Sequence, residues 1–314
     1  MSTTGQIRPR DSRAGFILVA ALWILIALAT LAVIASVYVA QSAVALRASD
    51  EPIRSEAAIT AGLELTAYQL SAPTNGGRRP TRGGFRFRLP NCDVTLEFMS
   101  EAARIDLNVA PKAMIARLFM TLGVQADAAD YYAERIVAWR SPPKSNGEDE
   151  EAALYRAAGL LYGPRRGPFN HVDELWLILN IPPVLVERAL PHITLFSGMA
   201  DVNVLDAAPE VVASLPGMTP ARLNAFLGQR ESLPPDPQFI LGALGDDKQV
   251  GATVTGGDAY RVRLRLTFAD GRQKISEVVI MLTGITTKDS YRVLAWKDDI
   301  NMATGAPFGP EATR

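Results

Sequence analysis

Few side chains in this sequence could act as catalytic bases. There are two histidines, His171 and His192, and they stand beside Asp173 and Pro191 in contexts that a helix start and packing explain. The sequence contains no nucleophile elbow, Walker loop, dinucleotide fingerprint or metal-spaced pair of histidines. We therefore expect no catalytic residues, no bound cofactor and no enzymatic activity.

Metal and redox chemistry have equally few candidates. The single cysteine, Cys92, excludes an intrachain disulfide and a multi-cysteine metal cage, and we expect it to be a small buried hydrophobic side chain. The acidic run at residues 148–151, EDEE, offers carboxylate oxygens of the kind that calcium prefers. A solvated charged loop is the simpler interpretation, so we expect no metal site and leave calcium open as the alternative.

The charge balance limits the kinds of partner that the chain can attract. Lys and Arg total 32 against 33 for Asp and Glu, so the chain has no net basic field that would gather nucleic acid. Partners must therefore be recognised by local surfaces.

An apolar segment near the N-terminus predicts a membrane anchor. Residues 16–40 are almost wholly apolar, and this exceeds the roughly 20 residues that a helix needs to cross a bilayer. Arg8, Arg10 and Arg13 precede the segment against Asp11 alone, which predicts a cytoplasmic N-terminus and a body on the other side of the membrane. The alternative is a removed secretory signal cut near residues 43–45, AVA, but such signals use apolar regions of roughly 7–15 residues.

The border of this segment is more specific. Residues 13–19 read RAGFILV, a glycine followed by an aromatic residue, and this resembles the leader site of the type IV pilin and pseudopilin family. The resemblance implies that a prepilin peptidase cuts between Gly15 and Phe16 and methylates the new N-terminus. Most members have a glutamate where this chain has Ala20, and the departure is similar to the K-type minor pseudopilin of type II secretion systems. A carboxylate in lipid needs a partner, and a subunit at the tip of a filament has no neighbour above it to supply one.

Helical spacing continues beyond the span to about residue 70, with Pro52 expected to kink the helix or mark a new start. We expect the sheet of the body to pack on one apolar stripe of this helix. The stripe consists of Leu46, Ile53, Ala57, Ala61, Leu65 and Tyr68.

Alternating apolar and polar residues predict strands that bracket the middle of the chain. They lie at residues 85–89, 93–98, 260–266, 275–282 and 290–296, with turns at residues 90–91 and 270–271. Between residues 105 and 245 the pattern is helical and broken by Pro and Gly, which predicts a helical domain inserted between early and late strands.

Two stretches of this insert look alike. Residues 106–111, DLNVAP, open a helix that runs to Leu122, and the segment from Asp201 opens one that ends near Leu215. Gly217 then ends that helix and residues 219–220, TP, start the next, which predicts a helix-hairpin-helix-like, SAM-like unit in which Leu215 and Leu223 are buried. Such hairpins bind DNA phosphates in other proteins, but residues 201–230 hold three acidic residues against two arginines and no lysine.

The middle of the insert resembles, in order, the helical domain of the K-type pseudopilins. The matching positions are Trp139, the acidic run, Tyr155, residues 162–164 (YGP), 169–175 (FNHVDEL), 190–191 (LP) and 196–198 (FSG). Aspartates usually follow the aromatic residue in that family, whereas residues 139–143 read WRSPP, and this puts an ion-binding role of that loop in doubt.

The fold class that we expect is α+β, with a long transmembrane helix, a pilin-like antiparallel sheet and a large inserted helical domain. The expected parts are a leader (1–15), a transmembrane helix (16–40), a pseudopilin helix with the first strands (41–104), the insert (105–245), the last strands (246–300) and a tail (301–314).

By resemblance, the chain is a non-catalytic minor pseudopilin that supports pseudopilus assembly and protein secretion across the outer membrane. Its partners would be other minor pseudopilins, secretion-system inner-membrane proteins and the prepilin peptidase, and not nucleic acid. The location would be the bacterial inner membrane, crossed once, with a cytoplasmic N-terminus and a periplasmic body. Two alternatives stay open: a membrane-anchored DNA-binding protein of an uptake system, and a periplasmic hydrolase with a signal anchor.

Overall fold

The computed structural model describes residues 13–72, 79–90, 92–143, 149–234, 236–245, 250–284 and 289–298. The side chains of residues 13–15 and 40–51 are outside this description, as are most of the predicted leader, the predicted tail, Asn91 of the first turn and Glu148 of the acidic run. Two compact units divide the chain, residues 1–57 and residues 58–314.

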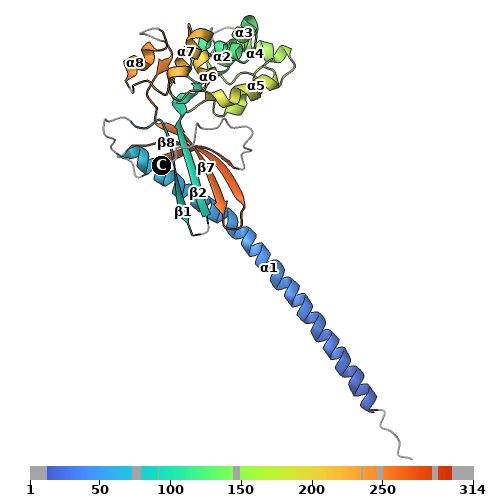
Figure 1. Cartoon of the computed structure of the whole chain (residues 1–314). Helices are drawn as coiled ribbons and strands as arrows, with labels where there is room; N and C mark the ends of the chain where they lie inside the picture. The colour runs from blue at the N-terminus through green and yellow to red at the C-terminus, as the bar shows by residue number, and fades with distance from the viewer. Residues whose placement is uncertain are drawn as a thin grey trace, which may run out of the picture. The chain divides into compact units, whose positions relative to one another are not determined.

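The first element is one long helix, α1 (Arg13–Ser71), and it confirms that the helix continues to about residue 70 (Figure 1). Pro52 lies inside α1, which has no new start at this residue, and the alternative of a kink there stays a prediction. A proline removes one backbone hydrogen bond, and the helix here continues on both sides of that single loss.

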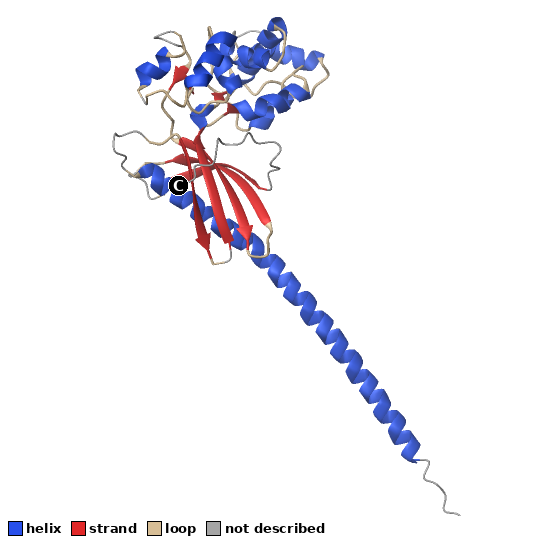
Figure 2. Ribbon diagram, viewed as in Figure 1, coloured by secondary structure: helices blue, strands red, loops and turns tan. Residues whose placement is uncertain are grey.

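Five antiparallel strands form one sheet in the order β1-β2-β7-β8-β9 (Figure 2). They confirm the predicted strands and the turn at residues 270–271, where Gly271 has φ +83°. In β2 and β7 buried residues alternate with more exposed ones, as expected for a sheet with one face in the core. The strands are β1 (Arg82–Leu89), β2 (Cys92–Ser100), β7 (Ala259–Phe268), β8 (Gln273–Leu282) and β9 (Tyr291–Asp298).

The core of the sheet forms against the C-terminal part of α1, but the predicted stripe of α1 is not the face that it uses. Ile53, Leu65 and Tyr68 are 68%, 41% and 74% exposed. From residue 58 onward the buried residues of α1 are Ala58, Ile59, Leu63, Thr66, Ala67 and Leu70, which together with Gly62 face the inner side chains of the strands.

Size explains why the stripe prediction was wrong. Several positions on the buried face have small side chains, and these let the helix backbone approach the sheet closely. At Gly62 an added Cβ would stand 2.5 Å from Leu264 Cδ2 and 3.1 Å from Leu96 Cδ1. The hydroxyl of Thr66 donates to the Gly62 carbonyl at 2.7 Å, so this polar group is satisfied within the helix.

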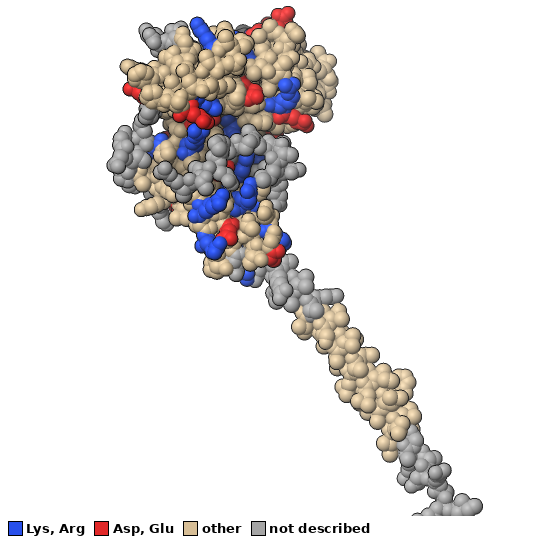
Figure 3. All heavy atoms as spheres, in the orientation of Figure 1, with Lys and Arg blue, Asp and Glu red and all other residues tan. Residues whose placement is uncertain are grey.

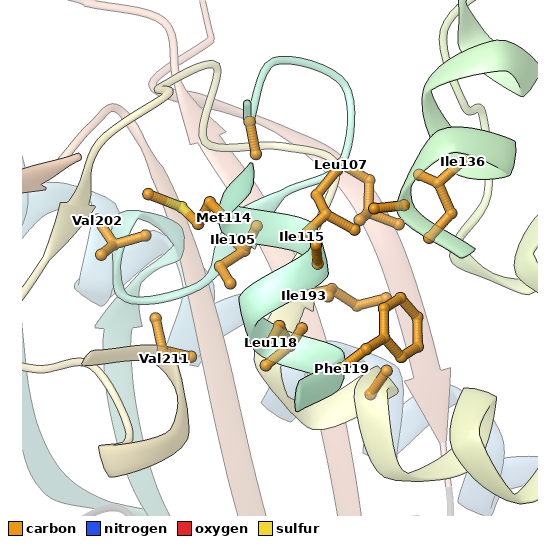
Figure 4. Close-up of a cluster of buried hydrophobic side chains, with 14 of the residues drawn as sticks. Ile105, Leu107, Met114, Ile115, Leu118, Phe119, Ile136, Ile193, Val202 and Val211 are labelled. Carbon is orange, nitrogen blue, oxygen red and sulfur yellow. The ribbon is translucent and has the colours of Figure 1, made fainter. Parts of the chain in front are cut away.

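A helical insert leaves the sheet after β2 and returns at β7. Because β2 and β7 are paired neighbours, with Ser100 opposite Tyr260, both ends of the insert meet at the same end of the sheet. Its helices are α2 (Lys112–Thr121), α3 (Ala126–Arg140), α4 (Glu150–Ala157), α5 (Pro183–Ala189), α6 (Pro209–Ala213), α7 (Pro220–Gln229) and α8 (Pro237–Gly242), with 3-10 turns η1 (Glu101–Ala103), η2 (Val172–Leu177) and η3 (Leu190–His192). A separate hydrophobic core holds them together, part of which Figure 4 shows around α2.

The two look-alike stretches of the sequence have the same local structure. β3 (Ile105–Asp106) pairs in parallel with β4 (Ile193–Thr194), and β5 (Val202–Asn203) pairs in parallel with β6 (Ala252–Thr253). After each first strand a side-chain oxygen accepts from the backbone two residues on, Asp106 from Asn108 at 2.8 Å and Asn203 from Leu205 at 3.1 Å. A helix, a glycine turn and a second helix follow in both cases.

In both halves an arginine at the end of the second helix donates to carbonyls of the turn that follows the first strand. The guanidinium of Arg140, the last residue of α3, donates to the carbonyls of Leu107 and Ala110. Arg230, directly after α7, donates to Ala207 at 2.8 Å and reaches Val204 at 3.5 Å. The correspondence of these contacts supports an internally repeated insert.

The predicted helix-hairpin-helix-like unit around Gly217 is confirmed, with one correction. Gly217 has φ +75°, Thr219 accepts from the Arg222 amide at the start of α7, and Leu215 is fully buried. Leu223 is only partly buried, whereas Phe226 is fully buried and fills the core from α7. Phe226 lies three residues after Leu223, on the same side of α7.

Replacing Gly62 by valine should lower the free energy of unfolding by about 1–3 kcal/mol, because the new methyl groups would overlap Leu264 and Leu96. The measurement is urea unfolding of the full chain in detergent micelles. Thr60→Val, on the exposed side of the same turn, is the matched control and should change the value by less than about 0.5 kcal/mol. Equal effects of the two substitutions would contradict close packing at Gly62.

Candidate functional site

The predicted membrane anchor lies within α1. Phe16–Val39 is a stretch of 24 residues with mean hydropathy 2.9, and none of it is buried in the structure. At about 1.5 Å per residue this segment is about 36 Å long, enough for a hydrocarbon core of about 30 Å. Figure 3 shows neither charge colour along this stretch. Its length and composition fit a transmembrane anchor.

The predicted processing site stands at the start of this anchor. Gly15 and Phe16 are both in α1, and the Phe16 side chain is 76% exposed. The side chain of Trp23 is 69% exposed as well, and Ala20 is half-buried. Cleavage between Gly15 and Phe16 stays a prediction.

The two histidines lie in different elements, and His171 caps the turn that follows it. His171 precedes η2, where its Nδ1 accepts from the Asp173 amide at 3.2 Å, and Glu174 completes the cap. His192 ends η3, and burial lowers the pKa of its imidazole. Cys92 is 8% exposed in β2, and burial raises the pKa of its thiol.

Two described members of the acidic run, Asp149 and Glu151, pair with arginines of the chain. Asp149 caps α4 by accepting from the Ala152 amide at 3.1 Å, and Arg166 holds both of its oxygens. Glu151 is 7% exposed and lies 2.7 Å from Arg135. Across the residues that the structure describes, no group of three or more His, Cys, Asp or Glu side chains is arranged to hold a metal ion.

One site was missed by the sequence analysis, a buried carboxylate between the sheet and the insert. Glu101 in η1 is fully buried, and the guanidinium of Arg261 on β7 donates to its two oxygens at 2.7 and 3.1 Å. Arg104 donates to the same carboxylate at 3.1 Å, and Thr194 of β4 donates a further hydrogen bond. This carboxylate therefore links the central strand β7 to two segments of the insert.

The network continues on both sides of Glu101. Arg261 also bonds Glu277 of β8 at 2.7 Å, and Arg263 bonds the other oxygen of Glu277 at 3.1 Å. Arg104 donates in addition to the carbonyl of Pro191 at 3.0 Å. The alternating arginines of β7, which in sequence resemble a solvent-facing row, are thus partly used to hold the insert.

Burial alone would raise the pKa of Glu101, but the charges of Arg261 and Arg104 and their hydrogen bonds lower it from 4.5 to about 2. The carboxylate is therefore ionised in the folded protein at neutral pH. Leaving it or its arginines without a partner would be costly, because a single buried charge has lost its hydration.

A second link between sheet and insert has the same character. The side chain of Asp206, after β5, is 2% exposed and lies 3.4 Å from Arg82 at the start of β1. Asn203 also donates to it at 2.8 Å. Burial raises the pKa of Asp206, and the nearby Arg82 and Arg230 oppose that shift.

Comparison with known proteins agrees with this architecture. Residues 97–198 match the family model described as "Type II secretion system (T2SS), protein K". The fold is similar to a chain of the crystal structure of the GspK-GspI-GspJ complex from the type 2 secretion system of enterotoxigenic Escherichia coli, with a TM-score of 0.60 and 16% sequence identity. That match covers 82% of this chain and 99% of the other. A search of curated proteins gives no match.

Replacing Glu101 by glutamine should lower the free energy of unfolding by about 3–5 kcal/mol at neutral pH, because Arg261 and Arg104 would lose their buried counter-charge. Urea unfolding of the full chain in detergent measures this. Glu187→Gln, at an exposed position on α5, should change the value by less than about 0.5 kcal/mol.

The wild type and the Glu101→Gln variant should also differ in how their stability depends on pH. The pKa of Glu101 is lower in the folded chain than in the unfolded chain, so its contribution is complete above pH 4.5 and is lost as the pH falls toward about 2. In that window the stability of the wild type should fall more steeply than that of Glu101→Gln, by at most about 1.4 kcal/mol per pH unit. Parallel curves would contradict an ionised Glu101.

Residues 97–198 thus match the protein K family of the type II secretion system, and the fold of the chain is similar to that of a chain in the GspK-GspI-GspJ complex.

Proposed function

We propose that this protein is a non-catalytic minor pseudopilin at the tip of the type II secretion pseudopilus. There it supports assembly of the pseudopilus and secretion of proteins across the outer membrane. The observation that carries the proposal is the protein K fold, in which an anchor helix is joined to a sheet whose neighbouring strands β2 and β7 hold a large helical insert.

The proposed location is the bacterial inner membrane. The arginines before Gly15 favour a cytoplasmic N-terminus, so the sheet and insert work on the periplasmic side. A prepilin peptidase cuts after Gly15, and Phe16 becomes the methylated first residue. Secretion-system proteins of the inner membrane are further expected partners, and nucleic acid is not.

The tip position is supported by Ala20. A glutamate at this depth of the span needs a cationic partner from a neighbouring subunit, because an unpaired carboxylate in lipid is unfavourable. The methyl group of Ala20 makes no such demand. A subunit with no neighbour above it has no partner for a carboxylate at this position, so an alanine there costs it no interaction.

The insert supports the same conclusion. It adds seven described helices at one end of the sheet, where β2 and β7 meet it. A second copy of the chain that stacked on this end would have to pass the insert, so the protein caps a filament and does not extend it.

The exposed residues of α1 offer a surface for partners. Leu65 and Tyr68 are exposed one turn apart on the side of α1 that the sheet does not cover. Exposed apolar residues that lie together typically mark a protein contact. The similar structure is a complex of GspK with GspI and GspJ, so we assign the surface of Leu65 and Tyr68 to another minor pseudopilin.

Replacing Gly15 by leucine should block processing, since the bulky side chain would occupy the position next to the cut bond. Mass analysis of the N-terminus in a peptidase-competent cell should give Phe16 as the first residue of the wild type and Met1 for the variant. Gly15→Ala is the control and should be cut in part. A wild-type terminus at Met1 or near Ala45 would defeat the proposed site.

Replacing Leu65 by aspartate should prevent assembly. Cells that lack the gene should not secrete, and the wild type should restore secretion while Leu65→Asp should not. Copurification with the other minor pseudopilins should fail in parallel.

Leu161→Asp is the matched control, because this leucine of the insert is fully exposed and should tolerate the charge. Normal secretion without the gene would overturn the proposed role, and so would long filaments formed by this protein alone. Equal loss of copurification in both variants would reject the assignment to Leu65.

A further inference from the structure

Arg166 brings together three segments of the insert. Its guanidinium bonds both carboxylate oxygens of Asp149, one of them at 2.8 Å, at the start of α4. It also donates to the carbonyl of Ala138 at 2.8 Å and reaches that of Ser141 at 3.4 Å, at the end of α3. One cation is thus surrounded by oxygens from segments on both sides of the α3–α4 connection.

The backbone at Arg166 is also held in place. Its φ is +60°, in the left-handed region that disfavours residues with a Cβ. Its amide donates to the carbonyl of Trp139 at 2.8 Å, so the residue contacts the end of α3 with both its main chain and its side chain. A residue other than glycine in this conformation costs about 1–3 kcal/mol and persists only where its surroundings hold it.

The oxygens around Arg166 belong to the types that calcium binds, a carboxylate and backbone carbonyls. These oxygens carry negative or partial negative charge, so at close range they repel one another unless a cation lies among them. Here the guanidinium supplies the positive charge, and the planar fork matches the two oxygens of Asp149. The acidic run, which suggests a calcium loop in the sequence, is therefore already neutralised at Asp149 by the chain itself.

We propose that Arg166 is the resident cation of this oxygen cluster, so that the end of α3 and the start of α4 are joined by an arginine and not by a metal ion. The insert consequently folds independently of calcium. Removing the guanidinium, in contrast, leaves a cluster of oxygens that a calcium ion would occupy.

The test uses the full chain in detergent micelles, with the melting temperature followed by tryptophan fluorescence. Wild-type Tm should be the same in EDTA and in about 10 mM CaCl2, a concentration above the dissociation constants of weak calcium sites. Arg166→Gly, which fits the positive φ, should lower Tm by about 3–6 °C in EDTA. Calcium should restore part of that loss, and magnesium less, because it gives up its water ligands reluctantly.

Two further variants distinguish the effect of losing the positive charge from a general destabilisation of the fold. Arg166→Lys keeps a positive charge without the fork and should give an intermediate Tm with little response to calcium. Arg165→Ala removes the adjacent arginine, whose partner is Glu174 at 3.4 Å, and should show no calcium response.

The proposal is overturned by a calcium-dependent Tm in the wild type, or by an unchanged Tm in Arg166→Gly. A loss of Tm in Arg166→Gly that calcium does not restore would also overturn it, because the guanidinium would then act only as a hydrogen-bond donor.

Discussion

The carboxylate of Glu101 is the interaction on which the arrangement of sheet and insert depends. It is fully buried, yet it is ionised, because Arg261 from the sheet and Arg104 from the insert both bond it. Hydrophobic contacts between the two cores are non-directional, whereas the buried carboxylate of Glu101 requires its arginines within hydrogen-bonding distance. The insert is thereby fixed at the end of β2 and β7, and this placement is what the proposed capping role needs.

Arginines act in the same way throughout the insert. Its helices are short and its connections long, so many backbone carbonyls near helix ends and turns have no partner within a helix. Arg140 and Arg230 satisfy equivalent carbonyls in the two repeated halves, and Arg166 does so between α3 and α4. Three arginines of the insert are thereby directed to carbonyls of the chain itself.

In helix α1 the large apolar residues and the small residues lie on different faces, and it is the face with small residues that is buried. The large apolar residues Leu65 and Tyr68 follow helical spacing and predicted the contact with the sheet, but they are exposed. The face that packs contains Gly62 and Ala58, because the distance from helix to sheet leaves room for little more than backbone there. The large residues on the other face are then available for a partner, and the proposed assembly surface follows from that assignment.

The sequence by itself determined the apolar anchor, the strands, the glycine at the hairpin and the order of the elements, since each depends on residue type and spacing along one segment. Only the tertiary structure decided which face of α1 is buried, that Phe226 and not Leu223 fills the core, and that Glu101 meets Arg261 from a strand far along the chain. Those outcomes depend on distances between segments that are remote in sequence, and no local pattern of residues records such distances.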